Sequence, residues 1–239
     1  MVEQESNEDS VDNSLSITRH KIIFVGDTCT GKTSIINRII DNPFNETYEV
    51  SIGIDFMSKN IRFRGQNIKI QIWDSAGQEK YKGLIPSYVR NSSIVFIVYD
   101  ISNRSSFENV PNWISFVQNI EKTTMVLCGN KSDLNRQVER NEAEELCKKD
   151  GLQLFECSAK TNENIKKMFY SSIAGLSTFG VYDNSEKDSL ISELLEENCG
   201  EEFKGAGVTA VLSSQPQGAL NVNGETSTGK SMKKKKCGC

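Results

Sequence analysis

The sequence has no run of about 20 apolar residues, the length that a membrane-spanning helix needs. It begins MVEQESNEDS, which is acidic instead of basic and apolar, so we expect no signal peptide there and folding in the cytosol. The seven cysteines lack paired metal-ligand spacing apart from the last two, and an odd number argues against a disulfide framework. A net charge of -4 over 239 residues gives no general attraction to nucleic acid.

The composition divides the chain into three parts. Residues 1–17 carry acidic side chains and no basic one, so we expect a disordered acidic arm. Residues 181–239 run from acidic through Gly/Ser-rich to four consecutive lysines, and we expect a flexible tail. A short partner-binding helix within that tail remains an alternative, although so short an isolated helix is marginal in water. Its apolar face would comprise Leu190, Ile191, Leu194 and Leu195.

Residues 18–180 alternate apolar runs with segments of helical period, which predicts an α/β domain with a mostly parallel sheet. Runs such as SIVFIVYD are apolar almost throughout, as expected of strands with helices on both faces. The runs GIDFMSKNIRF and NIKIQIW are separated only by Arg64, Gly65 and Gln66, too little chain for a crossover. They therefore predict an antiparallel hairpin. We predict six strands, one of them an antiparallel edge strand, and about five helices.

A phosphate-binding loop is predicted at residues 26–33, where GDTCTGKT follows an apolar strand and precedes a helical segment. Such a loop lets successive backbone N–H groups converge on phosphate oxygens at a helix N-terminus. Lys32 would reach the β- and γ-phosphates, and Thr33 would offer its hydroxyl to Mg²⁺. This motif predicts a P-loop NTPase and leaves ATP and GTP open. The nucleotide-binding candidates here are Asp27, Thr28, Cys29, Thr30, Gly31, Lys32, Thr33 and Ser34.

The choice of base depends on NKSD at residues 130–133, which follows the apolar run TMVLCG. This is the edge where a nucleotide lies in a doubly wound sheet. A carboxylate at Asp133 can accept hydrogen bonds from guanine N1 and N2, and adenine has no such pair of donors. On its own, a match to so short a motif is more typical of a turn in a solvated loop. Its position about 100 residues after the P-loop favours guanine recognition by Asn130, Lys131 and Asp133.

These motifs, with WDSAGQE at residues 73–79 and CSAK at residues 157–160, resemble those of the Ras-superfamily small GTPases over residues 20–178. The resemblance implies that Asp74 holds Mg²⁺ through water, that the Gly77 amide touches the γ-phosphate and that Gln78 orients the attacking water. Gln78 and Lys32 are then the catalytic residues. The resemblance adds nucleotide contacts from Phe44, Tyr48, Ser51, Ser158, Ala159 and Lys160, with Ala159 donating its N–H to guanine O6.

Some of these positions carry alternatives. Phe44 matches the aromatic residue that packs on guanine, yet ordinary core packing also explains it. Ser51 stands where the family nearly always has the threonine that ligates Mg²⁺, and its hydroxyl can make the same bonds. Thr30 and Ser75 are also departures from the common residues. The three departures Thr30, Ser51 and Ser75 leave open the alternative that the protein is a GTP-binding membrane scaffold with little hydrolysis. A further alternative is an ATP-using P-loop kinase.

Residues 52–56, 69–73 and 81–90 resemble the stretches that distinguish Rab GTPases, and with Trp113 they are most similar to a Rab subgroup of Golgi traffic. The resemblance implies a monomeric switch in vesicle transport that hydrolyses GTP to GDP and phosphate with Mg²⁺. Its partners would be an exchange factor, an activating protein, a GDP-dissociation inhibitor, a prenylation escort and effectors. The implied effector surface is Ile52, Gly53, Ile54, Asp55, Phe56, Trp73 and Tyr88, although its aromatics would also suit plain packing at a sheet edge.

The sequence ends in Cys237, Gly238 and Cys239, which is not a C-a-a-X pattern. Cys-x-Cys resembles the doubly geranylgeranylated end of Rabs, and two lipids beside four lysines make membrane attachment stable. We therefore expect the cytoplasmic face of intracellular membranes, with the Golgi favoured and endosomal traffic as the alternative. His20, at the start of the first strand, is expected to be structural.

Overall fold

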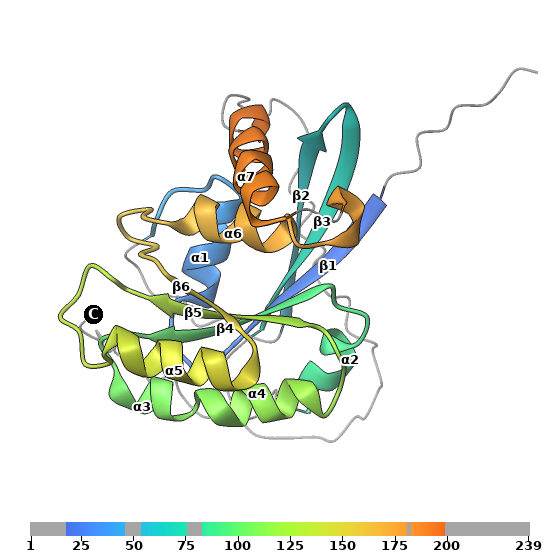
Figure 1. Ribbon diagram of the computed structural model, residues 1–239. Coiled ribbons are helices and arrows are strands. Elements are labelled where there is room, and N and C mark those ends of the chain that lie inside the picture. Colours follow the sequence, from blue (N-terminus) through green and yellow to red (C-terminus); the bar gives the residue numbers. More distant parts are fainter. Residues whose placement is uncertain (1–17, 46–53, 76–82, 181–182, 199–239) are drawn as a thin grey trace, which may run out of the picture.

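The computed structural model describes residues 18–45, 54–75, 83–180 and 183–198. These residues form a six-stranded sheet in the order β2-β3-β1-β4-β5-β6 (Figure 1). Only β2 and β3 pair antiparallel, so the predicted hairpin and edge strand are confirmed. The strands are β1 (Thr18–Val25), β2 (Ile54–Phe63), β3 (Gln66–Ser75), β4 (Ile94–Asp100), β5 (Thr124–Asn130) and β6 (Gln153–Glu156).

Helices cover both faces of the sheet (Figure 1). On one face lie α1 (Lys32–Ile39) and α6 (Ile165–Ile173); on the other lie α2 (Ile85–Val89), α3 (Arg104–Glu108), α4 (Val110–Gln118) and α5 (Arg140–Asp150). A 3-10 turn at Ser177–Phe179 follows α6. The described residues between 20 and 180 thus hold six α-helices, where about five were predicted. The extra one arises at Pro111, which sits in the first turn of α4 and separates it from α3.

The alternation of side chains along β1 explains why the domain has two hydrophobic clusters. Ile22 and Phe24 face α1 and α6, and Ile23 and Val25 face the helices of the other side. All four side chains are fully buried. Each face of a strand receives every second residue, so an almost continuous apolar run is needed when both faces are covered.

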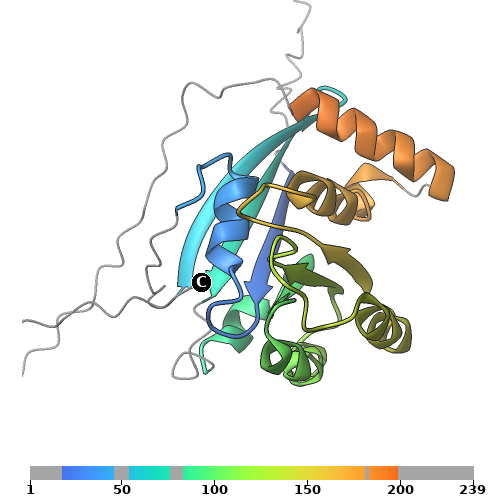
Figure 2. The ribbon, with the colours of Figure 1, turned by 90° about the vertical axis from the view of Figure 1, so that its left-hand side faces the viewer.

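The structure differs from the sequence prediction after residue 180. Residues Asn184–Asn198 form a helix, α7, which packs on α6 and the hairpin side of the sheet (Figure 2). Leu190 and Leu194 are 1% and 0% exposed within the same cluster as Phe63 and Phe179. The expected flexible tail was therefore wrong for this stretch: a helix that is marginal alone becomes stable when its apolar face is buried.

Polar contacts attach the end of α7 to the turn of the β2–β3 hairpin. Glu193 accepts two bonds from the Arg64 guanidinium, and Asn198 exchanges two bonds of 3.0 Å with the Arg62 backbone. Among the helices that the structure describes, none is long and apolar enough to cross a membrane.

Candidate nucleotide-binding site

The loop at residues 26–31 leaves the buried end of β1 and leads directly into α1. Gly26 has φ +139°, and a Cβ there would lie 2.2 Å from the Val98 carbonyl oxygen. Gly31 has φ +90°, and its Cβ would lie 2.2 Å from the Asn130 Nδ2 atom. Both positions therefore require glycine. Because Gly31 has no side chain to cap α1, the first N–H groups of that helix are suited to an anion.

Lys32 is the central cation of this loop. Its Nζ atom donates to the carbonyl oxygens of Gly26, at 3.0 Å, and Asp27, at 2.7 Å. Burial lowers the pKa of Lys32 to about 8, opposed by the carboxylates of Asp74 and Asp27. The ammonium group is therefore mostly protonated at pH 7, as a phosphate-binding group must be.

Asp74 and Thr33 form the acidic side of the site. The Thr33 hydroxyl donates to Asp74 Oδ2, whereas Asp74 Oδ1 is buried without a hydrogen-bond partner among the described residues. Burial raises the pKa of Asp74 to about 6, opposed by the Thr33 hydrogen bond and the Lys32 charge, so the carboxylate is mostly ionised at pH 7. A buried anionic oxygen beside a hydroxyl is the donor set that Mg²⁺ prefers, directly or through water. These residues therefore fit Mg²⁺.

Asn130 joins the P-loop to the other two motifs. Its Nδ2 donates to the Thr30 carbonyl at 2.9 Å, and its Oδ1 accepts the Ala159 N–H at 3.1 Å. The Ser158 hydroxyl donates to the Asp133 carboxylate at 2.5 Å. Residues 26–33, 130–133 and 157–160 thus meet at the carboxyl ends of β1, β5 and β6. The Ala159 N–H predicted to reach guanine O6 is engaged by Asn130 in this structure.

Arg38 is among the residues of this region that the sequence analysis missed. Arg38 of α1 donates to the carbonyl oxygens of Ala159, at 2.8 Å, and Lys160, at 3.0 Å. Its guanidinium also lies 5.9 Å from the centroid of the Phe44 ring, which packs against the α1-side cluster. Arg38 therefore ties the predicted guanine-binding loop to α1. No local motif marks it, since its partners lie 121 and 122 residues away.

A comparison with protein-family models identifies the chain. The model described as the Ras family matches residues 21–177, which is more than half of the chain. The chain belongs to the Ras family. Membership implies, in general terms, a GTPase that binds guanine nucleotide and Mg²⁺ and is controlled by exchange factors and activating proteins. It also removes the alternative of an ATP-using kinase.

The remaining predicted residues of this Ras-family protein divide into two groups. In the described part, Thr28 and Cys29 are exposed at the loop tip, Ser34 lies in the first turn of α1, Lys131 pairs with Asp100 at 2.8 Å, and Lys160 is exposed. The other group lies outside the described residues, so those predictions stay predictions: Tyr48, Ser51, Ile52, Gly53, Gly77, Gln78, Cys237 and Cys239.

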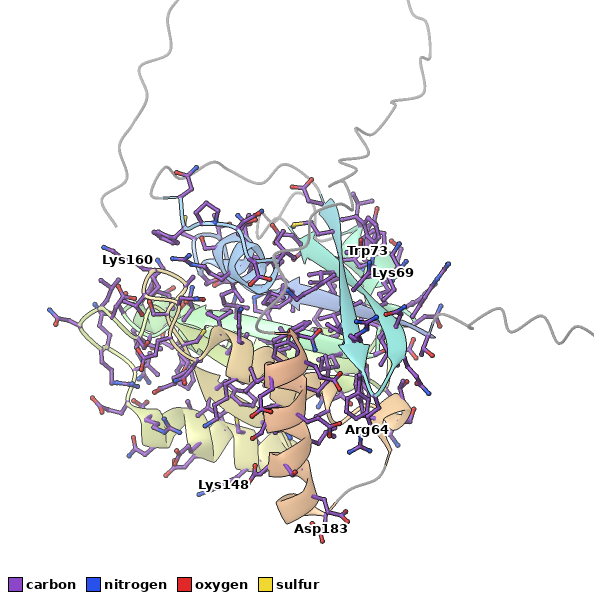
Figure 3. The ribbon with its side chains drawn as sticks, turned by 90° about the horizontal axis from the view of Figure 1, so that it is seen from above. Arg64, Lys69, Trp73, Lys148, Lys160 and Asp183 are labelled. Atoms are coloured by element: carbon purple, nitrogen blue, oxygen red, sulfur yellow. The ribbon has the colours of Figure 1, made fainter. Side chains whose placement is uncertain are left out.

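The predicted effector residues that the structure describes lie on the hairpin and α2. The Trp73 ring centroid is 5.1 Å from that of Phe56 and 5.0 Å from that of Tyr88, and Phe56 is 38% exposed. Ile54 begins β2, and Asp55 beside it is exposed. In Figure 3, Trp73 and Lys160 lie on well-separated parts of the domain. The aromatic cluster, defined as Phe56, Trp73 and Tyr88, is therefore distinct from the guanine end of the site.

Proposed function

We propose that this Ras-family GTPase is a Rab-like switch that recruits effector proteins to intracellular membranes in vesicle transport, with Golgi traffic favoured. The main support is the aromatic cluster, in which Trp73 contacts both Phe56 and Tyr88. Trp73 directly precedes Asp74, so this surface and the proposed Mg²⁺ site are neighbours on β3. A change in the ligand bound at Asp74 can therefore alter the position of Trp73, which belongs to the surface that partners would bind.

The proposed roles follow from the charges of the site. Lys32 binds the β- and γ-phosphates, Asp133 accepts from the guanine base, and Gln78 orients the attacking water. Thr33, Ser51 and Asp74 would hold Mg²⁺, which when bound neutralises charge that develops on the phosphates. Water takes the γ-phosphoryl group of GTP, leaving GDP and phosphate. An activating protein would supply further positive charge and accelerate this step.

The membrane part of the proposal rests on the C-terminal residues. Geranylgeranyl groups on Cys237 and Cys239, assisted by the preceding lysines, would give two hydrophobic anchors. A prenylation escort and a GDP-dissociation inhibitor would then handle the lipidated protein between membranes.

The alternative of a scaffold that hardly hydrolyses GTP is weakened by two contacts. Ser75 donates to the Phe24 carbonyl at 2.7 Å in the core, and Thr30 donates to the Asp27 carbonyl at 3.0 Å. Both unusual hydroxyls are thus used within the fold. Thr30 shares the Asp27 carbonyl oxygen with Lys32, whose Nζ atom still donates to it at 2.7 Å, so we favour a hydrolysing switch.

Single-turnover hydrolysis of GTP separates the switch from the scaffold. We expect slow hydrolysis by purified protein, acceleration by a Rab-activating domain, and its loss in Gln78→Leu with GTP binding retained. Gln118→Leu makes the same chemical change at the exposed end of α4 and should behave as wild type. Normal hydrolysis by Gln78→Leu would contradict the role given to Gln78; no acceleration of the wild type would favour the scaffold.

Imaging of an amino-terminally tagged protein beside Golgi and endosome markers tests the location. We expect wild type and Gln78→Leu on Golgi membranes, and the double variant Cys237→Ser, Cys239→Ser in the cytosol. Cys199→Ser provides a control for loss of a cysteine elsewhere in the chain. Endosomal labelling with the same cysteine dependence would refute the Golgi assignment alone, whereas membrane labelling without both terminal cysteines would refute the proposed anchor.

A further inference from the structure

Asp27, the second residue of the P-loop, is held from outside the loop by α4. Its Oδ1 atom accepts hydrogen bonds from Asn109 Nδ2 at 2.6 Å and from Trp113 Nε1 at 2.8 Å. Asn112 Nδ2 donates to Asn109 Oδ1 at 2.7 Å, which fixes the orientation of the Asn109 amide. Two donors from the start of one helix therefore converge on one carboxylate oxygen.

The backbone carbonyl group of Asp27 accepts hydrogen bonds from within the P-loop. Its carbonyl oxygen accepts from Lys32 Nζ at 2.7 Å and from the Thr30 hydroxyl at 3.0 Å. Asp27 is thus the residue where the contacts of α4 and those of the phosphate-binding lysine meet. The charge of the Asp27 carboxylate also raises the pKa of Lys32 against the effect of burial. A change in the position of this carboxylate would therefore change the electrostatic environment of the ammonium group.

A carboxylate in a P-loop has the same sign of charge as the phosphates that the loop is built to bind. If it were released from α4, it would repel those phosphates and compete for Lys32. Donors that hold it against α4 satisfy its charge through two hydrogen bonds, which are strong because the acceptor is ionised.

The ordinary structural roles of these two side chains do not account for this geometry. Asn109 occupies the N-cap position of α4, but in the described structure its side chain makes no capping bond to that helix and donates instead to Asp27. Trp113 is 4% exposed and packs edge-on against Phe116, which requires the indole ring but not its N–H group.

We propose that Asn109 and Trp113 are positioning residues for nucleotide binding: they hold the Asp27 carboxylate against α4 and so keep Lys32 available to the phosphates. This inference rests on the proposed phosphate-binding role of Lys32. It follows that retention of nucleotide depends on the start of α4, a segment more than 80 residues from Asp27 in the sequence.

The test is the release rate of a fluorescent GDP analogue from the full chain with Mg²⁺ present. Asn109→Asp places a second carboxylate against Asp27, and we expect release to be about tenfold faster, since hydrogen bonds to a charged group are lost and repulsion is gained. If Asn109 acted only as the N-cap residue of α4, this substitution would leave the release rate unchanged, because Asp and Asn are about equally favoured at that position. Asn119→Asp, the same substitution at the exposed C-terminal end of α4, is the matched control and should release as wild type.

A charge swap tests whether the effect arises at the contact between Asp27 and Asn109. The double variant Asp27→Asn, Asn109→Asp again places one amide and one carboxylate at this contact, so the like-charge repulsion introduced by Asn109→Asp is removed. We expect its release rate to return to within about threefold of wild type, in line with coupling between residues in contact. Trp113→Phe keeps an aromatic ring at this position and removes the N–H donor, so faster release is expected there too, even if Asn109→Asp fails to fold.

Wild-type release rates in both Asn109→Asp and Trp113→Phe would overturn the inference. So would a double variant no slower than Asn109→Asp. These failures differ from failure of the proposed function: without phosphate binding the wild-type chain would not bind the GDP analogue, and a scaffold would bind it but show no accelerated GTP hydrolysis.

Discussion

Lys32 and Asp74 are buried charges whose pKa values are shifted toward each other, to about 8 and about 6. Burial is the main cause in both, because each charged form loses hydration. Their mutual attraction and the Thr33 hydroxyl offset only part of this effect. Both remain mostly ionised at pH 7, so the site keeps the charges that GTP and Mg²⁺ require. A buried charge pair of this kind is better explained by function than by stability.

His20 allows a prediction at the same scale, because it is the only histidine of the chain. Its ring nitrogens lie 3.1 Å from the Ser93 hydroxyl and 2.6 Å from the Thr178 hydroxyl, and burial lowers its pKa below 6.5. The unfolded chain therefore binds the proton more readily, so stability falls as pH drops below about 6.5. We expect an NMR titration of the ring protons to have its midpoint below that of the chain in urea.

The matching control is His20→Asn, whose melting temperature should fall less than that of the wild type between pH 7 and pH 5.5. A native midpoint at or above the value in urea would contradict the prediction, and would mean that the ring is more hydrated than its contacts imply.

At the scale of elements, α7 follows the residues that match the Ras-family model and packs on the sheet and helices that they form. Its attachment has an apolar part at Leu190 and Leu194 and a polar part at Glu193 and Asn198. The Arg64–Glu193 pair is partly exposed, with side chains 53% and 33% accessible, so it contributes little. The buried leucines therefore account for most of the docking free energy.

We expect Leu194→Ala to lower the free energy of unfolding by about 2–4 kcal/mol, measured by urea denaturation, because a fully buried leucine leaves a cavity. Ser192→Ala, on the exposed face of the same helix, should change it by less than about 0.5 kcal/mol. Equal effects of the two substitutions would mean that α7 does not stay docked in solution.

At the scale of the whole molecule, the nucleotide joins parts of the chain that are distant in sequence. The P-loop, NKSD and CSAK motifs come from three segments, and Asn130 already bridges them. A ligand that binds only the folded state stabilises it in proportion to the logarithm of its concentration. Nucleotide should therefore affect the stability of the entire domain.

We expect GDP with Mg²⁺, at 100 times its dissociation constant, to stabilise the chain by about 2.7 kcal/mol. The measurement is the shift of the thermal unfolding midpoint. EDTA should reverse most of the shift, because Asp74 Oδ1 then loses its cation, and ATP at the same concentration should produce little. An equal shift with ATP would contradict guanine recognition by Asp133.

Motifs that are local in sequence were sufficient to predict much of this protein. The apolar runs determined the six strands, the short Arg64–Gln66 connection determined the antiparallel pair, and GDTCTGKT and NKSD located the two halves of the site. Each of these depends on periodicity, turn length or the spacing of neighbouring residues, which the sequence displays directly.

Other features were decided only by the tertiary structure. Arg38 and Asn109 lie in ordinary helical sequence and acquire their roles from partners 121 and 82 residues away. The sequence pattern of residues 184–198 does not show whether this segment is free or docked. In the structure, α7 is stabilised by packing in the cluster that contains Phe63 and Phe179. The physical reason is the same in each case: the stabilising contact is made between distant segments, so it exists only once the sheet has brought them together.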